Sequence, residues 1–165
     1  MLFLTGNVSE VSDQLLAIGQ EAPGAWLMPH FAPRSRRTLV GFVLAERGED
    51  AAANRAFDES LEASEEAVTN GSTMKGRALD AASIHAYRGD HEAALGELER
   101  AYTLGFRADF ALAVDPFFVS VREEPRFKAL LERMADSQRE QREIALRTGL
   151  LEGYDNLILA GPTKR

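Results

Sequence analysis

The sequence predicts an all-α protein, and three observations carry that prediction. Proline and glycine occur at intervals and separate segments of about 12 to 20 residues. Within those segments the apolar residues recur at helical rather than alternating spacing. Two neighbouring segments place their apolar residues at the same distances from a turn glycine, which indicates a repeated helix-turn-helix. We therefore expect one α-α superhelix over residues 1–165, closed at its C-terminal end by a helical cap.

The first and second full repeats are expected at residues 34–70 and 74–105, and a partial repeat at residues 1–28. After Gly48 and again after Gly89, small and large apolar residues fall at offsets of 5, 9, 12 and 13. The positions are Ala53, Phe57, Ser60 and Leu61 in one copy, and Ala94, Leu98, Ala101 and Tyr102 in the other. Because the small residue recurs at the first offset, we expect paired helices to approach most closely there.

This spacing resembles the tetratricopeptide repeat. The likeness rests on Gly41, Ala53 and Phe57 in one copy and on Ala82, Gly89, Asp90 and Ala94 in the next. The chain departs from the motif at Arg37 and Ala78, where tryptophan is frequent. The stretch from Ala78 to Phe106, followed by DPFFVSVREEPRF, is also similar to the C-terminal end of helical repeat regions in bacterial signalling and regulatory proteins. The resemblance implies a right-handed superhelix.

Two helix starts are predicted within the cap, residues 106–150. Proline is favoured at the first helical position, so Asp115-Pro116 and Glu124-Pro125 each begin a helix, with Asp115 as an N-cap. The apolar residues that follow are expected to cover the last repeat, and they are Phe117, Phe118, Val121, Phe127, Leu130, Leu131 and Met134. Charged residues over 132–147 are expected to form the polar outer face of the cap.

The resemblance implies a concave face lined by the first helix of each repeat. The positions are Thr38, Phe42, Ala45 and Glu46 in one repeat and Leu79, Ser83, Ala86 and Tyr87 in the next. Repeats that hold a terminal carboxylate use basic or amide side chains here, and none of these residues is basic. We therefore expect a protein or peptide partner anchored by apolar side chains on Phe42 and Tyr87, with Glu46 favouring a basic flank. The alternative is that Phe42 and Tyr87 only pack between helices.

Composition excludes several functions. The chain has 19 basic and 26 acidic residues, a net charge of −7, which opposes nucleic-acid binding. It has no cysteine, which excludes disulfides and thiolate metal sites and favours the cytoplasm. No apolar run is long enough for a membrane span, and the N-terminus does not read as a secretion signal. The spacing of the histidines and the absence of phosphate-loop and nucleophile motifs predict no metal, no cofactor and no catalysis.

Two further functions stay open. A pocket around Trp26, His30 and His85 would make the chain a small all-α enzyme or ligand-binding protein, although all three residue types are also typical of helix packing. The tail, residues 151–165, carries an apolar cluster, and that cluster would support self-association into a homo-oligomer. Its members are Leu157, Ile158 and Leu159.

Overall fold

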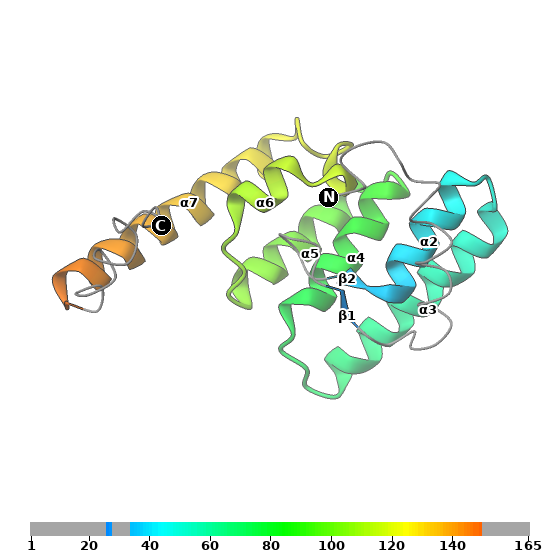
Figure 1. The fold of residues 1–165 in the computed structure, drawn as a ribbon, viewed down its shortest axis with the longest axis horizontal. Helices are drawn as coiled ribbons and strands as arrows, with labels where there is room; N and C mark the ends of the chain where they lie inside the picture. The colour runs from blue at the N-terminus through cyan, green and yellow to red at the C-terminus, as the bar shows by residue number, and fades with distance from the viewer. Residues whose placement is uncertain (1–25, 28–33, 150–165) are drawn as a thin grey trace, which may run out of the picture.

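The computed structural model describes residues 26–27 and 34–149, which form helices that pack one after another along the chain (Figure 1). The elements are β1 (Trp26–Leu27), β2 (Arg34–Ser35), α2 (Arg36–Glu46), α3 (Asp50–Thr69), α4 (Lys75–Tyr87), α5 (His91–Thr103), α6 (Asp109–Val114), the 3-10 helix η2 (Pro116–Phe118) and α7 (Pro125–Arg147). The mostly helical fold is confirmed. Three predicted features lie outside the described residues. They are the partial repeat apart from β1, the residue His30, and the tail that carries Leu157, Ile158 and Leu159.

Helices α2 and α3 form one helical hairpin, and α4 and α5 form the next. Each hairpin turns through a glycine with positive φ, 77° at Gly48 and 76° at Gly89, a conformation that strains any other residue. In both turns the residue after the glycine donates its backbone N–H to the carbonyl five residues earlier, at 2.9 Å. The two turns therefore have the same geometry, as the alignment on these glycines predicts.

The side chains at the predicted offsets are buried in both hairpins. Those at the first three offsets are at most 4% exposed in each copy, and those at the fourth are half-buried. A close contact between α2 and α3 lies at Gly41, where an added Cβ would be 2.6 Å from Cδ1 of Phe57. A ring packed this tightly against a helix backbone requires glycine at that position. The closest approach expected at Ala53 and Ala94 stays a prediction.

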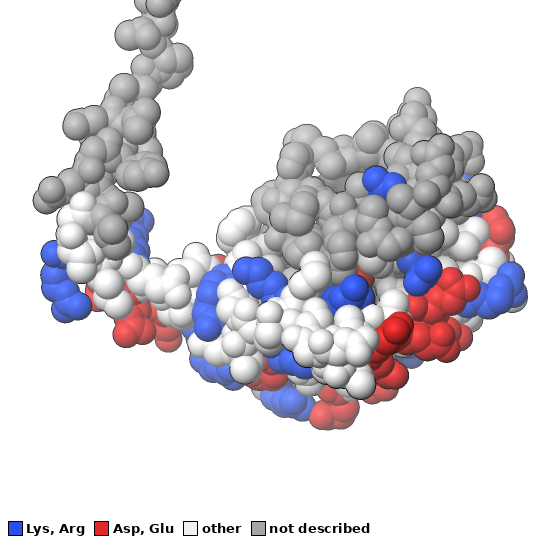
Figure 2. Space-filling model, turned by 90° about the horizontal axis from the view of Figure 1, so that it is seen from below, with Lys and Arg blue, Asp and Glu red and all other residues white. Residues whose placement is uncertain are grey.

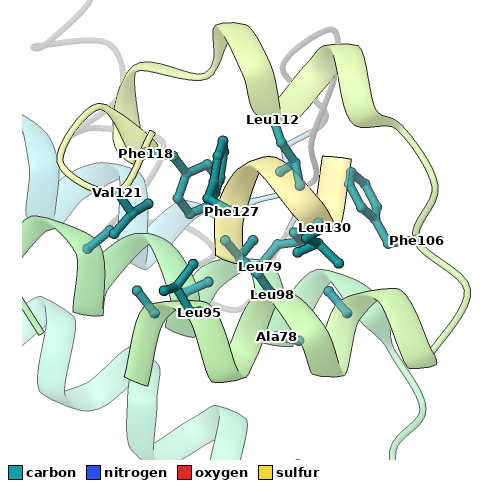
Figure 3. Packing of buried hydrophobic residues seen from close by; sticks show 14 of the residues in the cluster. Ala78, Leu79, Leu95, Leu98, Phe106, Leu112, Phe118, Val121, Phe127 and Leu130 are labelled. Carbon is teal, nitrogen blue, oxygen red and sulfur yellow. The ribbon is translucent and has the colours of Figure 1, made fainter. Parts of the chain in front are cut away.

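The main core lies where α4, α5, η2 and α7 meet (Figure 3). Helix α7 begins at Pro125, as predicted, and buries its first apolar residues against the last repeat. Phe118 of η2 packs beside Phe127 of α7, with ring centroids 6.2 Å apart. Asp115 caps η2, accepting the backbone N–H of Phe117 at 3.0 Å. The predicted double start thus does form a cap over the last repeat.

Phe117 departs from that prediction, because it does not cover the last repeat. Its ring stacks on Phe42 of α2, with centroids 4.0 Å apart and planes at 21°. Successive residues of a 3-10 helix point about 120° apart, so Phe117 and Phe118 enter different cores. Trp26, which the sequence suggested for a ligand pocket or for helix packing, is in neither a described helix nor a described cavity lining. It lies in β1, which pairs antiparallel with β2, Trp26 opposite Ser35.

Helix α7 continues beyond the other helices (Figure 1). Past Met134 its side chains are half-buried or exposed, which confirms the polar outer face expected there. From below, Figure 2 shows acidic and basic side chains interspersed over the described surface. Among the described residues no helix combines the length and the apolar character that crossing a bilayer requires.

Candidate functional site

Three of the residues predicted to line the concave face are inside the protein. Thr38, Leu79 and Ser83 are each 0% exposed and therefore offer no surface to a partner. Leu79 and Ser83 are buried because α4 is enclosed on several sides, by α3, α5, β2 and η2. Thr38 instead takes part in a buried hydroxyl cluster, 2.8 Å from Ser60 and 2.9 Å from Ser35 between oxygen atoms.

Four of the other five predicted residues, all except Ala45, line an open cavity of about 480 Å³, which we call the aromatic pocket. It lies where η2 and the residues after it face the C-terminal ends of α2 and α4. Its described lining consists of Phe42, Glu46, Ala86, Tyr87, Pro116, Phe117, Val119 and Ser120. The structure thus brings together Phe42, Glu46 and Tyr87, which the sequence analysis placed on one surface.

Three rings are packed together in the wall of the aromatic pocket. Phe42 stacks on Phe117 and meets Tyr87 edge-on, with centroids 5.4 Å apart and planes at 84°. Phe42 is only 5% exposed, so it serves mainly as helix packing. Tyr87 is 48% exposed and Val119 is 60% exposed. These two side chains offer the apolar surface that a ligand would contact.

The wall formed by η2 and the residues that flank it is fixed to α4 and to β2 by two polar contacts. Ser120 Oγ donates to the carbonyl of Ala86, the next-to-last residue of α4, at 2.8 Å. Arg34 Nη2 donates to Asp115 Oδ2 at 2.8 Å, and the arginine side chain is 1% exposed. The Arg34 guanidinium carbon also lies 5.6 Å from the ring centroid of Phe117. A buried ion pair therefore holds the turn that carries half of the pocket lining.

A second buried carboxylate lies in the same polar network. The backbone N–H of Ser35 donates to both carboxylate oxygens of Asp80, at 3.0 and 3.1 Å. Burial raises the pKa of Asp80 above its ordinary value of 3.8, and the nearby Arg34 charge opposes that shift. Asp80 thereby links β2 to the middle of α4, at a distance along the chain of 45 residues.

The aromatic pocket has an acidic electrostatic character. No lysine, arginine or histidine is among the described residues that line it. Glu46 is exposed, and in the described part of the chain no ion pair engages it. Glu46 and Tyr87 are the last residues of α2 and α4, so two helix C-termini also reach this region. Each C-terminus carries roughly half a negative charge from the aligned peptide dipoles of its helix.

His85, which was proposed for a ligand pocket, lies elsewhere. It lines a cavity of about 320 Å³ between α3, α4 and α5, together with Glu97 and Arg100. Arg100 is already engaged by Glu97, with Nε 2.7 Å from the carboxylate oxygen. Trp26 lies in β1 and His30 is outside the described residues, so the pocket proposed around the three stays a prediction.

The sequence analysis missed half of the pocket lining. Pro116, Phe117, Val119 and Ser120 were assigned to the cap alone. The signal that could have found them is the adjacent pair Phe117-Phe118, because two neighbouring rings on one helical turn cannot both enter the same core. One ring had to face another part of the molecule.

No protein-family model, curated protein or solved structure matches this chain. Within residues 26–27 and 34–149, no group of three or more acidic or histidine side chains is arranged to hold a metal ion.

Proposed function

We propose that the chain is a tetratricopeptide-like superhelix that acts as an interaction module or scaffold, binding a segment of another protein in the aromatic pocket. The bound segment contributes an apolar side chain, which packs on Tyr87 and Val119. The shared turn geometry and shared buried offsets of the two hairpins support a repeat fold of this kind. The absence of cysteine from the sequence favours action in the cytoplasm.

The observation that carries this proposal is the exposure of apolar side chains around a formed cavity. Tyr87 and Val119 are both about half exposed or more, while the rings beneath them are locked by stacking. Anchor residues of protein interfaces fill preformed pockets of this type, and tyrosine is enriched among the residues that contribute most to binding. A volume of about 480 Å³ is large enough for one or two side chains of a partner.

A display library of random peptides, panned against the purified protein, tests the proposal. Enriched peptides should carry an aliphatic or aromatic anchor and should bind with a heat measurable by calorimetry. Val119→Asp should abolish binding, because it places a charge where the anchor packs. Tyr87→Ala should weaken binding at least about tenfold, as expected of a central anchor contact.

Leu146→Ala is the matched control, since Leu146 is 54% exposed on α7 and outside the pocket. It should leave peptide affinity unchanged. Circular dichroism of each variant checks that the helices are intact, which matters for Tyr87 because its ring also contacts Phe42 and Phe57. Peptides that bind the Val119→Asp variant as well as the parent would refute the proposal, as would a library that yields no binder.

A further inference from the structure

Arginine, an aromatic ring and a carboxylate occur together three times among the described residues. In each case the guanidinium carbon lies 4.6 to 5.7 Å from a ring centroid and the same arginine donates to an Asp or Glu at 2.7 to 3.0 Å. The sets are Arg34 with Phe117 and Asp115, Arg88 with Phe57 and Asp58, and Arg133 with Tyr102 and Glu99. The ring supplies a negative face and the carboxylate the counter-charge, so the two act on one cation together.

The aromatic pocket holds a ring and a carboxylate of this kind without the arginine. Tyr87 and Glu46 occupy equivalent positions of the two hairpins, each two residues before the turn glycine, and both line the cavity. The arginine nearest in sequence to the ring is Arg88, which is already bound to Asp58 at 2.7 Å on α3. The ring is 48% exposed, so an incoming side chain can reach it.

Three features of the pocket favour a cation with an apolar stem. Glu46 supplies a full negative charge, and the C-termini of α2 and α4 add partial negative charge. Pro116 and Val119 supply exposed apolar surface along which an aliphatic stem can lie. A carboxylate or phosphate ligand would be repelled by the same groups.

Resting on the proposed function, we infer that the bound segment inserts an arginine side chain into the aromatic pocket beside its apolar anchor, since the cavity of about 480 Å³ has room for two side chains. Its methylene groups pack on Val119, its guanidinium lies against the Tyr87 ring, and it donates to the Glu46 carboxylate. Arginine fits better than lysine, because the planar guanidinium is weakly hydrated, stacks on rings and donates in two parallel hydrogen bonds. With a partner's arginine bound, the pocket has the same arrangement of arginine, aromatic ring and carboxylate that the chain forms internally three times.

The inference is tested with capped dipeptides titrated into protein that carries 13C-labelled tyrosine. Acetyl-Leu-Arg-amide is compared with acetyl-Leu-citrulline-amide, which has the same shape and no charge, over concentrations up to about 10 mM. The Tyr87 signal, identified by its loss in Tyr87→Phe, should shift with both peptides. The arginine peptide should bind about five- to tenfold more tightly, because an exposed cation–ring contact and an exposed ion pair together contribute that much. The lysine analogue should fall between the two.

Glu46→Gln should reduce the preference for arginine over citrulline to the part that the Tyr87 ring contributes, while leaving citrulline binding unchanged. Glu132→Gln is the matched control, since it removes the same charge from an exposed position on α7 and should keep the preference. Equal affinity for arginine and citrulline would overturn the inference while leaving an apolar binding pocket in place. An unchanged preference in Glu46→Gln would overturn it as well. If neither peptide shifts Tyr87, both the inference and the proposed function fail.

Discussion

The two helical hairpins have the same turn and the same buried offsets, but they differ in how completely they are covered. Helix α4 of the second hairpin has nine buried residues, whereas α2 of the first has five. The second hairpin lies between its neighbour and the cap, and its core is continuous with that of η2 and α7. The first hairpin contributes to a smaller core, which it shares with Ile84 of α4 and Phe117 of η2. The position within the repeat therefore determines the local backbone geometry, while contacts with neighbouring elements determine which side chains are buried.

The hairpins also fill the same contact with different pairs of residues. The first places Gly41 against Phe57, and the second has Ala82 and Leu98 at the equivalent positions. A larger side chain on one helix is matched by a smaller one on the other, so the helix separation can be kept. The Phe57 ring of the first hairpin also contacts the Tyr87 ring, with centroids 5.4 Å apart. Phe57 therefore supports the wall of the aromatic pocket.

The largest effect is expected from removing the cap residue that covers the second hairpin. Phe127 is 0% exposed and packs in the main core (Figure 3). Phe127→Ala should lower the free energy of unfolding by about 3 to 5 kcal/mol, the usual cost of deleting a buried ring. Urea denaturation followed by circular dichroism measures it. A loss below about 1 kcal/mol would mean that the cap does not stabilise the second hairpin.

The exchange of residue sizes is tested at Gly41. Gly41→Ala should cost about 1 to 3 kcal/mol, because the new methyl group overlaps the Phe57 ring. Adding Phe57→Leu gives the first hairpin the pair that the second one uses. The double variant should then be less destabilised than the sum of the two single variants, by a coupling of about 0.5 to 3 kcal/mol. Additive losses, measured by urea denaturation, would contradict the proposed equivalence of the two contacts.

The hairpins and the cap could be predicted from the sequence because each rests on a local rule. Glycine marks the turns, proline marks the helix starts, and the spacing of apolar residues marks the buried faces. The short helix α6 and the pairing of β1 with β2 were not predicted. They depend on contacts between segments rather than on any pattern within one segment.

The candidate site was predicted only in part, because contacts between elements bury positions that a helical period alone would expose. An idealised first helix exposes one face, but α4 is enclosed, so Leu79 and Ser83 are buried. Asp80 stands where the first hairpin has Leu39, and a carboxylate at that spacing reads as a surface residue. It is buried because Ser35 and Arg34 arrive from β2, which no helical period can indicate.

Asp80 gives the second hairpin a pH dependence that Leu39 cannot give the first. Because burial raises the pKa of Asp80 above 3.8, the folded chain retains its proton at pH values where the unfolded chain has lost it. The stability from this carboxyl is therefore fully present below pH 3.8 and declines as the pH rises through the folded-state pKa. Asp80→Asn lacks that decline, so the variant should gain stability relative to the parent as the pH rises.

Urea denaturation of both proteins between about pH 3.5 and pH 7 measures the difference, in which the contributions of the other carboxylates largely cancel. The fixed cost of replacing a hydrogen-bond acceptor shifts the whole curve and leaves its slope unchanged. A difference that stays constant across this range, or that moves toward the parent, would show that Asp80 is not held in the environment described.

The smallest effect is expected at the exposed link between the hairpins. Arg88, which follows α4, donates to Asp58 of α3 at 2.7 Å and lies 5.7 Å from the centroid of the Phe57 ring. Arg88→Ala should cost only about 0.5 to 1 kcal/mol, since the pair is exposed and screened by water. Arg55→Ala, on the exposed side of α3, is the control and should cost less.

High salt separates the two parts of the Arg88 contact, because about 1 M salt shortens the screening length to roughly 3 Å and weakens the ion pair more than the ring contact. The cost of Arg88→Ala should therefore shrink without vanishing. Arg88→Lys keeps the charge but loses the planar group, so at high salt it should be nearly as unstable as the alanine variant. If the lysine variant is as stable as the parent at every salt concentration, the Arg88 contact is only an ion pair. The contact of Arg88 with the Phe57 ring, which in turn packs on Tyr87, would then contribute nothing to the stability of the interface between the hairpins.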